Sequence, residues 1–150
     1  MTEAAAFPQP PDTGPEGSLP HSLAQRRIVR FEPGHAVIEY EVLPAICHSG
    51  GVAQGGFVAG WIDAAMAHAV MAKFGVERVP ISLEIKVSYF APARPGRVIA
   101  EGWIERRGKS TCFTEGVLKD ANGAVLAKAS STIRLVPMAK VEADARAALA

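Results

Sequence analysis

The sequence has little cysteine and almost no excess charge. Its 150 residues include two cysteines, Cys47 and Cys112, whose spacing matches no metal-binding or redox motif. That argues against a disulfide framework and a zinc site, and we interpret both as small hydrophobic residues in a reducing compartment. Sixteen basic and 15 acidic residues leave a formal net charge of +1. This excess is too small for a general nucleic-acid binder.

Targeting segments and long hydrophobic runs are also lacking. The N-terminus has no basic stretch followed by an apolar one, so we predict no signal peptide. The longest apolar run, residues 57–72, is shorter than the ~20 residues of a membrane span and contains Asp63 and His68. No two histidines have metal-ligand spacing, so we predict no metal. We therefore expect a cytoplasmic enzyme or binding protein without a membrane or nucleic-acid partner.

Several motifs of common enzyme classes are absent as well. The sequence contains no serine-hydrolase elbow, no Walker loop and no dinucleotide-binding fingerprint. What is present fits one globular domain, because 49% hydrophobic and 21% charged residues are ordinary globular usage. Residues 1–20, rich in proline, glycine and small polar residues, predict a disordered tail. The folded domain is predicted over residues 21–138, with a C-terminal tail, helical or frayed, over residues 139–150.

Hydrophobic periodicity predicts six strands and one helix. Gly55 or Gly56 begins the helix, which runs to about Phe74 and ends at Gly75. The predicted strands cover residues 28–31, 36–42, 82–90, 97–105, 110–119 and 124–136. The order is two strands, a helix and four strands in a meander, which is an α+β layout.

Two of these elements carry more specific expectations. The strand over residues 82–90 alternates with a period of two, which puts Ser82 and Glu84 on one face and Leu83 and Ile85 on the other. The helix is apolar on all sides, so it cannot lie on a protein surface. We expect the sheet to wrap it and a second subunit to cover the remainder, which predicts an obligate homo-oligomer.

Asp63 is the strongest candidate for chemistry because it is a carboxylate inside this apolar helix. Its helical neighbours at three and four positions are mostly small, whereas Phe57 and Trp61 lie on the opposite face. Small neighbours leave space beside the carboxylate for a ligand. A buried carboxylate needs a compensating partner. The alternative is a structural aspartate that caps the N–H groups of a neighbouring loop.

The start of the helix is the second candidate. Gln54, Gly55 and Gly56 place unpaired backbone N–H groups and the positive end of the helix dipole at one spot. Glycine allows close approach, so an oxyanion could be held there, although the glycines could also serve only to turn the loop. His48 lies in the preceding glycine-rich loop. It could donate a hydrogen bond to substrate or water, or be an ordinary surface residue.

Basic residues gather in the second half of the chain. Arg94 and Arg97 precede a cluster of Arg106, Arg107 and Lys109. Taken singly they are ordinary solvated strand ends. Grouped beside a cleft they could hold phosphates.

Taken together, these residues resemble the hotdog-fold acyl-CoA thioesterases of the phenylacetate-degradation (PaaI-like) type. The family pattern is an Asn or Gln in a loop, a glycine three residues later, His-Gly-Gly at the start of the helix, and an acidic residue inside it. The corresponding residues here are His48, Gly51, Gln54-Gly55-Gly56 and Asp63. Two residues depart from the pattern, because Gln54 stands where histidine is usual and His48 where Asn or Gln is usual.

The resemblance covers roughly residues 27–136 and continues after the helix. Residues 82–92 resemble the family's long strand, which ends in a proline turn, and Ser82 falls where a Ser or Thr faces the site. Residues 106–110 are similar to the turn that contacts coenzyme A. The implied fold is an antiparallel sheet of about six strands wrapped around one long buried helix.

The implied activity is hydrolysis of an acyl-CoA thioester to a free acid and CoA, with no cofactor beyond the CoA of the substrate. The Gly55 N–H would bind the thioester oxygen, and Asp63 would act as general base or nucleophile. His48 and Ser82 would position water or substrate. The remaining substrate and CoA contacts would come from Gln54, Gly56, Arg94, Arg106, Arg107 and Lys109.

In the family, one site draws Gly55 and His48 from one subunit and Asp63 and Ser82 from its partner. The resemblance therefore implies a dimer or a dimer of dimers, the latter a homotetramer. A non-catalytic acyl-CoA-binding or regulatory module on the same fold is the main alternative, and the displaced His48 favours it. A dehydratase on this fold lacks support, because no Asp/His pair lies on the loop and helix.

Overall fold

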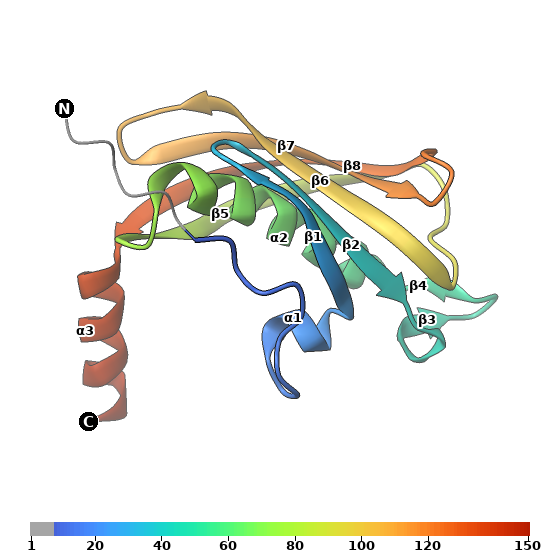
Figure 1. Cartoon of the computed structure of the whole chain (residues 1–150), viewed down its shortest axis with the longest axis horizontal. Helices are drawn as coiled ribbons and strands as arrows, with labels where there is room; N and C mark the ends of the chain where they lie inside the picture. Colours follow the sequence, from blue (N-terminus) through green and yellow to red (C-terminus); the bar gives the residue numbers. More distant parts are fainter. Residues whose placement is uncertain (1–7) are drawn as a thin grey trace.

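The computed structural model of the chain describes residues 8–150, so the first part of the predicted N-terminal tail lies outside the described residues (Figure 1). The elements are, in order, α1 (Leu19–Ser22), β1 (Gln25–Glu32), β2 (His35–Val42), the 3-10 turn η1 (Pro44–Ile46), β3 (Cys47–His48), β4 (Val52–Ala53), α2 (Gly55–Phe74), β5 (Arg78–Tyr89), β6 (Gly96–Arg107), β7 (Thr111–Asp120), β8 (Val125–Pro137) and α3 (Met138–Leu149). Six strands form one antiparallel sheet around α2. The predicted α+β hotdog fold is confirmed.

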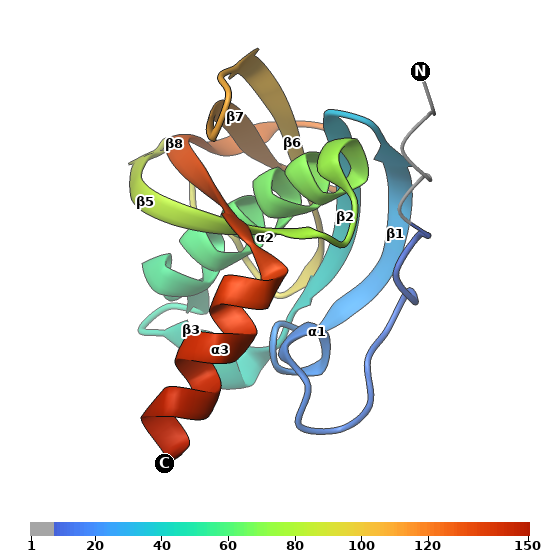
Figure 2. The ribbon, with the colours of Figure 1, turned by 90° about the vertical axis from the view of Figure 1, so that its left-hand side faces the viewer.

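The strand order corrects one predicted connection. The order is β1-β2-β6-β7-β8-β5, so β5 pairs with β8 at an edge of the sheet and the meander contains only β6, β7 and β8. Figure 2 shows the reason, because β1 and β2 curve along one flank of α2 while β5 runs along the other. An apolar helix needs cover on both flanks, and the strand that follows it supplies the second. The predicted loop before α2 also contains a short β3–β4 hairpin.

The helix α2 begins and ends where glycine predicts. Gln54 is its N-cap, and Gly75 ends it with a φ of 78°. The face toward the sheet is fully buried at Trp61, Ile62 and Met66, and Trp61 stacks on Tyr40 with ring centroids 5.9 Å apart. The hydroxyl of Tyr40 is buried with no hydrogen-bond partner among the described residues, and burial raises its pKa.

A glycine brings the sheet unusually close to the helix. A Cβ added at Gly102 on β6 would lie 2.4 Å from the backbone nitrogen of Met66. No side chain fits in that space, so β6 contacts the backbone of α2 directly. The opposite face of α2, around Asp63, carries half-buried Ala59, Gly60 and Ala67 that the sheet does not cover.

A register shift in β5 overturns the direction that strict alternation predicts for Ser82, whereas the resemblance expects Ser82 to face the site. Ser82 pairs with Ile133 and Glu84 with Thr132, so Leu83 has no partner on β8 and forms a β-bulge. Strict alternation predicted Ser82 on the same face as Glu84. The extra residue turns Ser82 to the helix side of the sheet and leaves Leu83 58% exposed.

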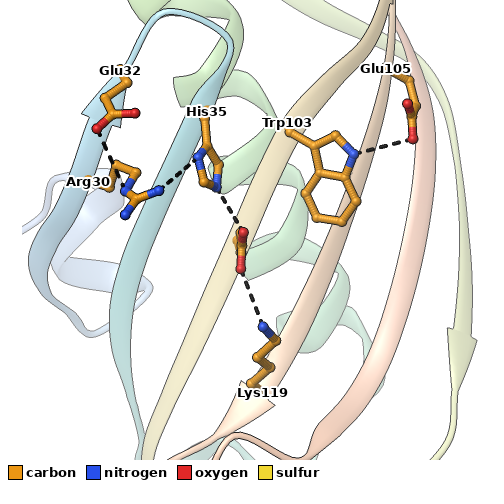
Figure 3. A network of polar contacts seen from close by, with 7 residues as sticks. Arg30, Glu32, His35, Trp103, Glu105 and Lys119 are labelled. Carbon is orange, nitrogen blue, oxygen red and sulfur yellow. Dashed lines mark hydrogen bonds and ion pairs between the residues drawn. The ribbon is translucent and has the colours of Figure 1, made fainter.

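The outer face of the sheet carries a polar network (Figure 3). His35 Nε2 lies 2.8 Å from Glu101 Oε1, Lys119 Nζ lies 3.4 Å from Glu101 Oε2, and Arg30 reaches His35 Nδ1 at 3.3 Å. Burial raises the pKa of Glu101, but the His35 hydrogen bond and the Lys119 charge outweigh it, so the pKa lies below its ordinary value. This network lies on the face of the sheet opposite α2.

The two ends of the described chain attach differently. Asp12 Oδ1 accepts a hydrogen bond from the Ile28 N–H at 2.9 Å, which ties the segment before α1 to β1. The helix α3 follows β8 directly, has no buried residue and projects away from the sheet in Figure 1. The predicted domain limits at residues 21 and 138 stay a prediction.

Candidate active site

Asp63 lies on the uncovered face of α2, where β5 passes beside it. The Ser82 hydroxyl donates a hydrogen bond of 2.7 Å to Asp63 Oδ1. No other hydrogen bond from the described residues reaches this carboxylate, so Oδ2 is free to accept a proton or a water. The hydroxyl is the compensating partner that a carboxylate in an apolar helix requires, and it also fixes the orientation of the carboxylate.

The N-terminus of α2 presents one unpaired backbone donor. The Gly56 N–H donates to Gln54 Oε1 at 2.7 Å, and the N–H groups of Phe57 and Val58 donate to the Gln54 carbonyl. The Gly55 N–H has no acceptor among the described residues. The side chain of Gln54 therefore acts as a helix cap. Of the predicted donors, Gly55 is the one left free for a ligand.

Tyr89, which the sequence did not single out, touches this same helix end. Its hydroxyl donates to the Gly55 carbonyl at 2.7 Å, and a Cβ at Gly55 would lie 3.1 Å from that hydroxyl. The end of β5 is therefore fastened to the first residue of α2. No sequence signal predicts the contact, because an aromatic residue near a strand end has no characteristic partner.

An open cavity of about 400 Å³ adjoins the helix N-terminus. Its lining combines the loop before α2, the first turns of α2 and the proline turn after β5: His48, Val52, Ala53, Gly55, Val58, Tyr89, Phe90, Ala91, Pro92 and Ala93. The cavity thus unites His48 and Gly55, two of the predicted site residues. Asp63 does not line it.

Helix geometry explains this separation. Gly55 and Asp63 are eight residues apart, which corresponds to about 12 Å along the axis of an α-helix. An oxyanion donor must lie about 3 Å from the oxygen it stabilises, and a general base must reach the attacking water at a similar distance. One chain therefore cannot apply both groups to one carbonyl.

The basic residues that were predicted to act together lie at opposite ends of α2 within one chain. Arg94 lies near the start of α2, where its guanidinium donates to the Gly50 carbonyl at 2.9 Å. Arg107 lies at the other end, 5.0 Å from the ring centroid of Phe74, the last residue of α2. A helix of 20 residues is about 30 Å long. The structure does not bring these two arginines together in one chain.

The family model of the thioesterase superfamily matches residues 50–127, just over half of the chain. The chain belongs to the thioesterase superfamily. This match begins in the loop before α2 and ends in β8, so it includes the helix N-terminus, Asp63 and Ser82.

Individual relatives agree with this membership. A Saccharolobus solfataricus protein for which an esterase activity is proposed is 28% identical over 103 residues, which are 69% of this chain and 73% of that protein. A Ralstonia eutropha protein related to phenylacetic acid degradation, proposed to be a thioesterase, has a structure that superposes with a TM-score of 0.72 at 26% identity, over 81% of this chain and 92% of that one. The predicted resemblance to phenylacetate-degradation thioesterases is confirmed.

A third relative matches in fold alone. The structure of a Streptococcus mutans protein bound to acetyl-CoA superposes with a TM-score of 0.68 at 20% identity, over 73% of this chain and 87% of that one.

The described residues include no group of three His, Cys, Asp or Glu side chains close enough to hold a metal ion. Within the same range, no helix has the length and hydrophobicity needed to cross a membrane.

Arg78, a basic residue that the sequence did not single out, lies beside the C-terminal end of α2. Arg78 lies 5.9 Å from the ring centroid of Phe74, on which Arg107 also rests, and its guanidinium donates to the Lys109 carbonyl at 3.4 Å. Arg78 begins β5, far in sequence from the turn after β6, so only the fold reveals that it joins Arg107 and Lys109. By contrast, Arg97 pairs with Glu39 at 3.1 Å.

Proposed function

We propose that this protein hydrolyses acyl-CoA thioesters at a site assembled from two copies of the chain. The Ser82–Asp63 hydrogen bond carries the proposal, because it orients a carboxylate with a free oxygen on the helix face that the sheet leaves uncovered. Membership of the thioesterase superfamily supports thioester hydrolysis, and the acetyl-CoA complex of the Streptococcus mutans protein supports a CoA ester as substrate.

Two chains are needed because Asp63 and the free N–H of Gly55 lie about 12 Å apart along one helix. In the proposed dimer, the helix N-terminus of one chain faces Asp63 and Ser82 of its partner. The same pairing would bring Arg94 of one chain toward Arg107 of the other. The assembly is a dimer or a dimer of dimers.

The proposed reaction starts with a water held by Asp63. Asp63 accepts a proton from this water as its oxygen attacks the thioester carbonyl carbon, and the carbonyl oxygen becomes an oxyanion bound by the Gly55 N–H. The intermediate collapses, the carbon–sulfur bond breaks, and the thiolate of CoA takes up the proton from Asp63. The products are the free acid and CoA. Direct attack by Asp63, with hydrolysis of the resulting anhydride, is the alternative course.

The polar and basic residues have supporting roles in this scheme. His48 lines the cavity beside Gly55 and would donate a hydrogen bond to water or the thioester carbonyl. Arg94, Arg106, Arg107 and Lys109 would bind the phosphates of CoA. The apolar cavity wall would accept the acyl group.

The test is a panel of short, medium, long and aromatic acyl-CoA thioesters, with free CoA measured by a thiol reagent. We expect Asp63→Asn to lower kcat at least 100-fold on the best substrate, in the range that loss of a general base gives. Asp144→Asn, the same change on the exposed helix α3, serves as the matched control and should keep full activity. A wild-type rate for Asp63→Asn would remove the carboxylate from the mechanism. Tight binding of acyl-CoA without release of CoA would instead identify a binding module.

A further inference from the structure

We propose that Glu84 is a positioning residue whose carboxylate holds the β-bulge at Leu83 and thereby aims Ser82 at Asp63. The inference deepens the proposed function, on which the catalytic importance of Ser82 rests. It concerns a residue on the outer face of the sheet, away from α2 and from the cavity at the helix N-terminus.

The part of β5 that precedes Glu84 could pair with β8 in either of two registers. In the observed register, Ser82 opposes Ile133 and Leu83 bulges out with 58% of its surface exposed. In a regular register, Leu83 would oppose Ile133 and point at the helix, while Ser82 would oppose Arg134 on the outer face. Burial of apolar surface does not explain the bulge, because the bulge leaves the Leu83 side chain exposed to solvent. Some other interaction must hold the bulge.

The contacts of Glu84 supply that interaction. Its Oε1 accepts hydrogen bonds from the Thr132 backbone N–H at 3.0 Å and from the Thr132 hydroxyl at 2.9 Å. Its backbone carbonyl accepts a third, from the Ser131 hydroxyl at 2.7 Å. A bulge interrupts the backbone ladder, and here the carboxylate of Glu84 serves as acceptor for the Thr132 N–H. Hydrogen bonds to an ionised carboxylate are among the stronger ones in proteins.

This arrangement makes Glu84 act only through Ser82. Glu84 is exposed on an edge strand, and none of its hydrogen bonds reaches α2 or the cavity. Removing its side chain should release the strand toward the regular register. The Ser82 hydroxyl would then leave Asp63, while the apolar wall of the cavity would keep its place.

The test compares Glu84→Ala with Glu84→Gln, whose amide oxygen can still accept from Thr132, and with Lys86→Ala, the next outward residue of the same strand. The first readout is the register, from interstrand NMR contacts of Ile133 with either Ser82 or Leu83. The second is kcat and KM on an acyl-CoA substrate. We expect Glu84→Ala to shift the contacts toward Leu83 and to lower kcat about five- to tenfold with KM unchanged, as loss of one hydrogen bond to a charged group allows. Glu84→Gln and Lys86→Ala should stay within about twofold of wild type.

A double variant shows whether the effect passes through Ser82. In the Ser82→Ala background, Glu84→Ala should cause no further loss of kcat. A full further loss, or a retained Ser82–Ile133 contact in Glu84→Ala, would overturn the inference. If Ser82→Ala alone hydrolyses at the wild-type rate, the proposed role of Ser82 fails, while the register measurement still decides the role of Glu84. Should Glu84→Ala not fold, Thr132→Val removes one of the two donors and should give a partial shift of the same kind.

Discussion

Ser82 and Asp63, 19 positions apart in the chain, share a hydrogen bond of 2.7 Å from hydroxyl to carboxylate. Ser82 comes from an edge strand and Asp63 from the central helix, so the bond also links the two elements. It occupies Oδ1 and leaves Oδ2 free of the described residues. A carboxylate held in this way keeps one oxygen aimed at whatever lies on the uncovered face of α2.

The first prediction concerns this bond. Ser82→Ala should lower kcat about tenfold, because a hydrogen bond to a charged group is worth roughly 1.5–3 kcal/mol at most and solvent weakens this partly exposed one. Ser82→Thr keeps the hydroxyl and should retain most of the activity. Steady-state kinetics of the three proteins on one acyl-CoA substrate tests this prediction. Equal kcat values for Ser82→Ala and wild type would contradict a role for the hydroxyl.

The second prediction tests the shared site. Gly55→Pro removes the free N–H, and proline suits the first position of a helix after Gln54, which is already extended with a ψ of 136°. The Tyr89 hydroxyl, 3.1 Å from an added Cβ, must shift slightly to admit the ring. Gly55→Pro and Asp63→Asn should each be nearly inactive. Mixed by unfolding and refolding together, they should regain about a quarter of wild-type activity, since half of the dimers are mixed and each has one intact site.

The control for this experiment is each variant refolded alone, which should stay inactive. Recovery requires that Gly55 of one chain works with Asp63 of the other. No recovery from a mixture that demonstrably forms mixed dimers would mean that each site is built within one chain.

The third prediction uses the small residues beside Asp63. A Cβ added at Gly60 would meet only Leu23 Cδ2, at 3.7 Å. Alanine in a helix interior is favoured over glycine by about 0.5–1 kcal/mol, so Gly60→Ala should raise Tm by roughly 2–4 °C. If this helix face is reserved for substrate or a partner chain, activity should fall while stability rises.

The matched change at Gly102 should have the opposite effect on stability. There a Cβ would lie 2.4 Å from the backbone nitrogen of Met66, so Gly102→Ala must push the sheet from the helix. We expect Gly102→Ala to lower Tm sharply or to prevent folding. Thermal unfolding of both variants distinguishes a glycine kept for close packing from one kept for access.

The fourth prediction concerns pH. Burial lowers the pKa of His68 below its ordinary value of 6.5, although its hydrogen bond to the Ala64 carbonyl opposes the shift. The unfolded chain therefore takes up this proton at a higher pH than the folded chain. The free energy of unfolding should fall as pH drops below 6.5 and continue to fall until the folded pKa is passed.

His68→Phe provides the comparison, because phenylalanine does not titrate and can still pack against Phe31, which lies edge-on to the histidine ring at 6.3 Å. Denaturant unfolding at pH 5, 6 and 7 should show a smaller loss of stability for the variant than for wild type. If wild type and His68→Phe lose stability equally as the pH falls, His68 does not cause the pH dependence of the free energy of unfolding.

The helix and its limits could be predicted from the sequence because the signals are local. Gly55 and Gly75 stand at its two ends, and the apolar pattern between them needs no knowledge of the rest of the chain. Asp63 and Gly55 were found for the same reason. Both are unusual in their immediate surroundings, and the structure gives each an atom free of other described residues.

The remaining features depend on residues that lie far apart in the chain. The direction of Ser82 depends on a bulge that Thr132 helps to hold, so alternation within β5 gave the wrong face. Pairing of β5 with β8 depends on which flank of the helix is open. The contact of Tyr89 with Gly55 and the separation of Arg94 from Arg107 likewise follow from the path of the whole chain.

The capped start of α2 also bears on how a reaction would end. Because Gln54 occupies the Gly56 N–H, this helix end offers a single free donor, at Gly55. A single donor suits the one oxygen of a thioester carbonyl, but a carboxylate presents two oxygens and carries a charge that Asp63 of the partner would repel. The acid formed by hydrolysis should therefore leave readily, and we expect weak product inhibition by the free acid.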